Sequence, residues 1–92
     1  MKIPSKIKIG NLTYTVANLI ESESSHFGKS SHNEQWIRLS NRFGSEDKKG
    51  ETFLHEIIHQ ILDQGRYENT DEKMIDHLAR SLYQILKENK IF

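Results

Sequence analysis

Near the N-terminus, apolar and polar residues alternate with a period of two on both sides of the turn dipeptide Gly10-Asn11, a pattern typical of a β-hairpin. The hairpin is expected over about residues 5–20, and its apolar positions are Ile7, Ile9, Leu12, Tyr14 and Val16. The run "QWIRL" predicts another strand over about residues 34–40. Between them, the polar, serine-rich residues 21–33 predict a loop. We therefore expect a sheet of about three strands, antiparallel or mixed.

The second half of the chain changes to helical periodicity. The first helix is expected over about residues 51–64, with Gly65 as a left-handed C-terminal cap. A second is expected over about residues 71–89, capped by Asn69 or Thr70. The apolar positions that predict the two helices are Phe53, Leu54, Ile57, Ile58, Ile61, Leu62, Ile75, Leu78, Ala79, Leu82, Ile85 and Leu86. The pattern predicts a single α+β domain over residues 1–92, with the sheet packed on two helices.

Composition narrows the functions available to this domain. Thirteen basic and thirteen acidic residues give no net charge, so nucleic acid and anionic membranes are not favoured as partners. The absence of cysteine excludes disulfides, thiolate catalysis and cysteine-ligated metal, which leaves histidine and carboxylate as ligands for any ion. The start "MKIPSKIKIG" lacks the apolar core of a signal peptide, and no run is long enough to span a bilayer. A soluble cytoplasmic protein is expected.

The stretch "FLHEIIHQILDQG" carries the candidate chemistry. Residues four apart lie one turn apart on the same helix face, so His55 and His59 can present two imidazoles to one metal ion. Both histidines border the apolar stripe of the helix, where one side gives rigid support and the other stays open to water and substrate. Glu56 is displaced from the pair and can act on water without ligating. The alternative is that "HEIIH" is a solvated helix face.

A third protein ligand is expected at the start of the second helix. Asp71, Glu72 and Asp76 are the candidates there, and their spacing does not decide between them. Asp71 can instead accept hydrogen bonds from backbone amides at the helix terminus. The longer Glu72 can reach the ion from the border of the apolar stripe, whereas Asp76 points further toward solvent.

The remaining polar and aromatic residues carry weaker expectations. Donors conceivable for a reaction oxyanion, without a spacing argument for any of them, are His26, Tyr67, His77 and Tyr83. His26 and His32 are otherwise expected to be exposed polar loop residues. Trp36 and Phe53 are expected in the core, because large aromatics in a small domain usually supply burial.

The stretch "TFLHEIIHQILDQG", followed by "DEKMIDHLARSLYQILKENK", resembles the small HExxH zinc metallopeptidase-like proteins of phages and mobile elements. These proteins are related to the ImmA/IrrE group within the gluzincin class. The hairpin "KIKIGNLTYTV" and the strand "QWIRLS" are similar to that group's layout, so the resemblance covers nearly the whole chain. It implies a minimal zincin-like fold.

The resemblance also implies a function. Zn²⁺ would be held by His55, His59 and Glu72, with Glu56 as the general base that deprotonates zinc-bound water, and "QWIRLS" would pair with a protein or peptide substrate. The implied activity is an endopeptidase acting on a phage or host regulator. One alternative is a zinc-stabilised binding module that docks a partner on its edge strand without cleaving it. Another is a metal-free adaptor in which the motif arose by chance.

Overall fold

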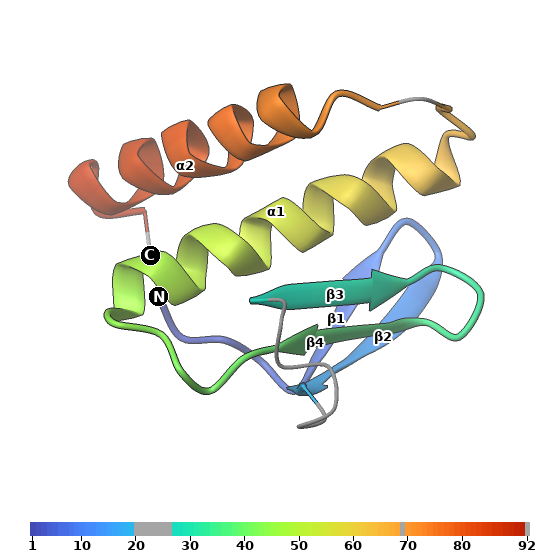
Figure 1. The fold of residues 1–92 in the computed structure, drawn as a ribbon, viewed down its shortest axis with the longest axis horizontal. Helices are drawn as coiled ribbons and strands as arrows, with labels where there is room; N and C mark the ends of the chain where they lie inside the picture. The colour runs from blue at the N-terminus through green and yellow to red at the C-terminus, as the bar shows by residue number, and fades with distance from the viewer. Residues whose placement is uncertain (20–26, 69, 92) are drawn as a thin grey trace.

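The computed structural model describes residues 1–19, 27–68 and 70–91, and the fold is α+β as predicted (Figure 1). Four strands precede two helices: β1 (Lys6–Ile9), β2 (Leu12–Asn18), β3 (Gly28–Ser31), β4 (Trp36–Leu39), α1 (Glu46–Gln64) and α2 (Glu72–Glu88). Both helices lie on the same side of the sheet. α1 covers the sheet, and α2 packs on the far side of α1, so the molecule has three layers.

The four strands form one mixed sheet in the order β1-β2-β4-β3. β1 pairs with β2 and β3 pairs with β4 antiparallel, whereas β2 and β4 run parallel. The prediction of about three strands was therefore one strand short, because β3 lies inside the run 21–33 that was expected to be a loop. The rest of that run up to residue 26 lies outside the described residues. The run "QWIRLS" was expected to form the edge of the sheet that pairs with a substrate. Instead, β4, which lies in this run, is an interior strand, and β3 forms the edge.

The β1–β2 hairpin is confirmed, and the predicted turn dipeptide joins its strands. Ile9 and Leu12 are the last pair in the register, so the loop has two residues. Gly10 takes a φ of 60°, a left-handed conformation that glycine adopts without a steric penalty. A tight two-residue loop fixes the register, which directs one face of the hairpin toward α1.

α1 begins five residues earlier than predicted. Ser45 is its N-cap and accepts a hydrogen bond from the backbone amide of Lys48, and two acidic residues occupy the first turn near the positive end of the helix dipole. Toward the sheet, Phe53 completes a buried cluster with Ile9, Tyr14, Ile37 and Leu39. Toward α2, Leu54 packs in a second cluster with Ala79 and Tyr83. The helix is therefore apolar on two sides.

α2 matches the predicted range closely, but its N-cap is Asp71 rather than Asn69 or Thr70, and Asn69 lies outside the described residues. The two helices approach closely where Gly50 faces the ring of Tyr83, because a Cβ on Gly50 would overlap that ring. Beside this point the Tyr83 hydroxyl donates to Asp47 Oδ1 at 2.8 Å, and Lys87 donates to the same oxygen at 2.6 Å. The hydrogen bond from Lys87 lowers the pKa of Asp47.

The end of α1 also departs from the prediction. Gly65 is its C-cap with φ −80°, and the left-handed residue is the next one, Arg66, with φ 60°. The amide of Tyr67 donates to the carbonyl of Leu62 at 3.1 Å, which closes the helix end in the manner of a Schellman motif. A Cβ at position 65 would meet the exposed Tyr67 ring at 2.7 Å, so a larger residue there would require that ring to move.

None of the helices in the described part of the chain is both long and apolar enough to cross a membrane.

Candidate metal centre

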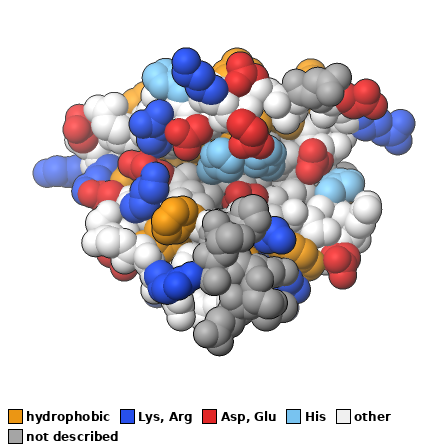
Figure 2. All heavy atoms as spheres, viewed as in Figure 1, with side chains coloured by type: hydrophobic (Ala, Val, Ile, Leu, Met, Phe, Trp, Pro, Cys, Tyr) orange, Lys and Arg blue, Asp and Glu red, His pale blue; other side chains and the backbone are white. Residues whose placement is uncertain are grey.

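Two imidazoles from α1 and one carboxylate from α2 converge on one point. His59 Nε2 lies 2.7 Å from Glu72 Oε1, and His55 Nε2 lies 3.2 Å from Glu72 Oε2. The two imidazole rings are 4.9 Å apart between centroids. Figure 2 shows the histidine atoms at the centre of one face of the molecule, with carboxylates around them. The structure thus brings together the three residues predicted as metal ligands.

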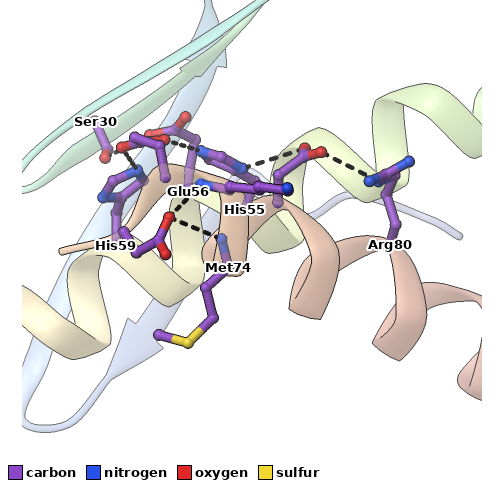
Figure 3. Close-up of polar contacts among 10 residues, drawn as sticks. Ser30, His55, Glu56, His59, Met74 and Arg80 are labelled. Carbon is purple, nitrogen blue, oxygen red and sulfur yellow. Dashed lines mark hydrogen bonds and ion pairs between the residues drawn. The ribbon is translucent and has the colours of Figure 1, made fainter.

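Local structure explains why these side chains meet. His55 and His59 are one helical turn apart on α1, on the side next to both α2 and the sheet edge. Asp71 ends the connection as the N-cap of α2, which makes Glu72 the first residue of the helix. The N-terminus of α2 lies over the two histidines (Figure 3), so a side chain as long as glutamate can reach both rings. The histidine side chains are about one-fifth exposed, and that of Glu72 is 65% exposed.

The donor set fits a metal ion. One ligand atom from each of the three residues can be chosen so that all lie within 4.8 Å of one another. A tetrahedral ion with bonds of about 2.0–2.1 Å needs donor atoms roughly 3.3 Å apart. The 3.2 Å between His55 Nε2 and Glu72 Oε2 is close to this spacing, and the 2.7 Å between His59 Nε2 and Glu72 Oε1 is shorter. Two neutral imidazoles and a carboxylate, with no thiolate, suit Zn²⁺ and other first-row divalent ions. The group can therefore hold a metal ion and leave a position open.

The other two predicted ligand candidates have different roles. Asp71 Oδ1 accepts hydrogen bonds from the amides of Lys73 and Met74 at 2.9 and 3.3 Å, so it is occupied in capping α2. Asp76 lies behind His55, with Oδ1 3.7 Å from Nδ1, the ring nitrogen that is not turned toward Glu72. Its other oxygen lies 3.1 Å from Arg80 Nε. At 3.7 Å this contact is an ion pair and not a hydrogen bond, and Asp76 does not belong to the group of converging donor atoms found among the described residues.

Glu56 lies next to the donor set and is buried, with 7% of its surface exposed. Its Oε1 accepts a hydrogen bond of 2.7 Å from Ser30 Oγ on β3 (Figure 3), and the Ser30 hydroxyl in turn accepts one of 2.8 Å from Gln60 Nε2. Gln60 is 1% exposed. Sequence analysis identified neither Ser30 nor Gln60. The available signal for Gln60 was its position one turn after Glu56 on the same helix face.

A polar cleft runs between β3 and the helices at this point. His55, Glu56, His59 and Glu72 line one side of it, and the edge strand lines the other with Gly28, Lys29, Ser30 and Ser31. A second hollow meets the first at Gly28, His55 and Glu56 and continues toward Phe27 and Thr52. The candidate base therefore lies where two hollows join along the free edge of the sheet.

The conceivable oxyanion donors do not gather at this centre. Tyr83 is buried between the helices, where burial, together with its hydrogen bond to Asp47, raises the pKa of its hydroxyl to about 12. Tyr67 is 66% exposed beyond the end of α1, His77 is exposed on α2, and neither lines the cleft. His26 lies outside the described residues.

Two other predictions on single residues need correction. His32, expected to be an exposed loop residue, is partly buried, and its Nδ1 lies 3.2 Å from the hydroxyl of the core residue Tyr14. Phe53 is in the core as predicted, but Trp36 is only partly buried. It lines the cleft and is covered by the Arg38 guanidinium, 3.9 Å from the ring centroid.

Comparison of the chain with protein-family models, with curated proteins and with solved structures gave no match.

Proposed function

We propose that the protein is a zinc-dependent endopeptidase with a zincin-like fold, as the resemblance of its HExxH stretch implies. The observation that carries the proposal is the convergence of His55, His59 and Glu72 beside a buried carboxylate, Glu56, that does not belong to the donor set. A structural metal site has no need of an additional carboxylate at that position. Zinc, when bound, supplies an electrophilic centre that polarises a peptide carbonyl and acidifies water.

In this proposal Glu56 is the general base and then the general acid. Its carboxylate takes a proton from the attacking water and passes it to the amine that leaves when the peptide bond breaks. Burial keeps the carboxylate away from bulk water, and the hydrogen bond from Ser30 restricts its orientation. Asp76 adds negative charge on the far side of the His55 ring, 3.7 Å from Nδ1.

The proposed substrate is an extended segment of a protein or peptide, with phage or host regulators as the class that the resemblance suggests. β3 is an edge strand beside the cleft, so its free backbone groups are available to pair with an added strand. This pairing would place the scissile bond beside Glu56. We further propose that the protein acts in the cytoplasm.

Metal content tests whether the protein binds zinc at the proposed site. We expect elemental mass spectrometry of untagged protein to find about one zinc per chain, lost in His59→Ala and weakened in Glu72→Ala, because each variant removes one donor. Asp71→Asn is the matched control, since it neutralises the neighbouring carboxylate but keeps an oxygen able to cap the helix. Zinc should also raise the unfolding temperature, and a chelator should reverse the gain.

Cleavage of a peptide library by the zinc-loaded protein tests whether the protein is a peptidase. We expect Glu56→Gln to keep its zinc and lose cleavage, because only the base is removed. A wild type that binds zinc but cleaves no peptide would instead favour the non-cleaving module that docks a partner on its edge strand. A wild type without zinc, even after supplementation, would overturn the proposal.

A further inference from the structure

We infer that Ser30 and Gln60 fix the Glu56 carboxylate in one orientation, with Oε1 as the anchored oxygen and Oε2 as the oxygen that exchanges the proton. This inference rests on the proposed function, in which Glu56 is the base. It concerns two residues that do not touch the donor set. Both are positioning residues, because they act only through Glu56.

The direction of the hydrogen bonds indicates that Ser30 donates its proton to Glu56 Oε1. A serine hydroxyl has one proton and rotates to suit its surroundings. Gln60 Nε2 donates to Ser30 Oγ at 2.8 Å, which occupies an acceptor site of the hydroxyl and leaves its proton free for Glu56 Oε1 at 2.7 Å. Because Gln60 is 1% exposed, water has little access to compete for that bond. The chain from Gln60 through Ser30 to Glu56 therefore has one favoured direction.

Strand and helix geometry supports the same reading. Ser30 pairs with Ile37 of β4, and the Ile37 side chain is fully buried beneath α1, so the side chains at these two paired positions face the helix. Gln60 follows Glu56 by one turn of α1, which places both beneath the strand. The interaction thus joins the sheet edge to the helix that carries the candidate base and both histidines.

The surroundings of Glu56 Oε2 indicate that it is the oxygen that exchanges the proton. Oε1 is engaged by Ser30, and Oε2 lies beside Gly28, where a Cβ would come within 3.3 Å of it. Glycine at this position of the edge strand places no side chain over that oxygen, and Gly28 and Glu56 both line the two hollows. An oxygen that is already a strong acceptor for Ser30 is the poorer proton acceptor of the two, so the geometry selects Oε2 for the proton transfer.

The first test uses NMR on the metal-free protein, where the side-chain carboxyl ¹³C of Glu56 is identified by its loss in Glu56→Gln. We expect the resonance to move in Ser30→Ala and in Gln60→Met, and to return to within a small difference of wild type in Ser30→Thr, which restores the hydroxyl. Ser31→Ala is the matched control, because the hydroxyl of Ser31 accepts a hydrogen bond from the Glu34 amide and not from the chain that holds Glu56. An unchanged resonance in Ser30→Ala would overturn the anchoring role.

The second test uses the zinc-loaded protein. Ser30→Ala should keep its zinc and lower kcat about tenfold with KM within about twofold, and Ser30→Thr should recover most of the loss. Full activity in Ser30→Ala would overturn the inference. A wild type that cleaves nothing would contradict the proposed function instead, while the NMR result would still decide whether Ser30 holds the carboxylate.

Gly28→Ala tests the role of Oε2. It is made in a Thr52→Ser background, because the new Cβ would otherwise meet Thr52 Cγ2 at 2.8 Å. Relative to Thr52→Ser alone, we expect a loss of kcat of about tenfold with zinc content unchanged, since the methyl group covers the reacting oxygen. Equal kcat in the two proteins would overturn the assignment of the proton to Oε2.

Discussion

At the scale of single residues, the acids at the start of α2 have distinct roles because the backbone position of each fixes its reach. Asp71 precedes the helix and caps its amides, whereas Glu72 opens the helix and reaches two imidazoles. Asp76 begins the next turn and reaches only the back of one ring. Side-chain length and one turn of helix therefore separate a cap, a candidate ligand and an acid that lies only behind one imidazole.

Gly50 gives a prediction at the same scale. Glycine inside a helix normally costs about 1 kcal/mol relative to alanine, but here a Cβ would overlap the Tyr83 ring of the neighbouring helix. We expect Gly50→Ala to lower the free energy of unfolding by about 1–3 kcal/mol, because overpacking outweighs the gain in helix propensity. Chemical denaturation measures the change. Gly44→Ala is the control, since no atom outside its chain neighbours lies within 4 Å of a Cβ there. A more stable Gly50→Ala would show that the helices can separate at no cost.

At the scale of elements, the number of neighbours of each helix explains which apolar positions are buried. α1 lies between the sheet and α2, whereas α2 contacts α1 on one side. Among the described helices and strands, α2 packs on α1 alone, and it buries Ile75, Ala79 and Tyr83. The apolar positions Leu78, Leu82 and Ile85, which contribute to the helical pattern, remain 41–49% exposed. A helical period indicates which residues share a face, but the burial of that face depends on how many neighbouring elements cover it.

The end of α1 gives a prediction at this scale. Arg66 closes the helix with a φ of 60°, a conformation that costs a residue with a Cβ about 1 kcal/mol or more. We expect Arg66→Gly to raise the free energy of unfolding by about 0.5–1 kcal/mol, after the larger entropy of the unfolded glycine chain is counted. Arg66→Ala separates backbone from charge, because it removes the guanidinium but keeps the Cβ. Equal gains in both variants would attribute the effect to the lost charge.

At the scale of the whole molecule, the sequence was enough to predict the elements that carry their own apolar period. The β1–β2 hairpin, β4, both helices and the pair His55 and His59 belong to this group. β3 was not predictable from "GKSS", because no apolar alternation marks it and its side chain at Ser30 is held by residues of α1 far along the chain. The choice of Glu72 over its neighbours likewise depends on how α2 packs against α1, which no local pattern encodes.

The place of β4 in the sheet determines how the chain must fold. β1–β2, β3–β4 and α1–α2 are each formed by neighbours in sequence and can close rapidly. The parallel junction between β2 and β4 is the one strand contact that needs segments roughly twenty residues apart, so its loop-closure entropy is the largest in the sheet. We expect pulse-labelled hydrogen exchange during refolding to protect the amides of Thr15 and Leu19, which donate across this junction, after those of the hairpins. Simultaneous protection would mean that the sheet forms in one step. Later protection of these two amides would mean that the central seam of the sheet, rather than either of its edges, is the last part of the sheet to form.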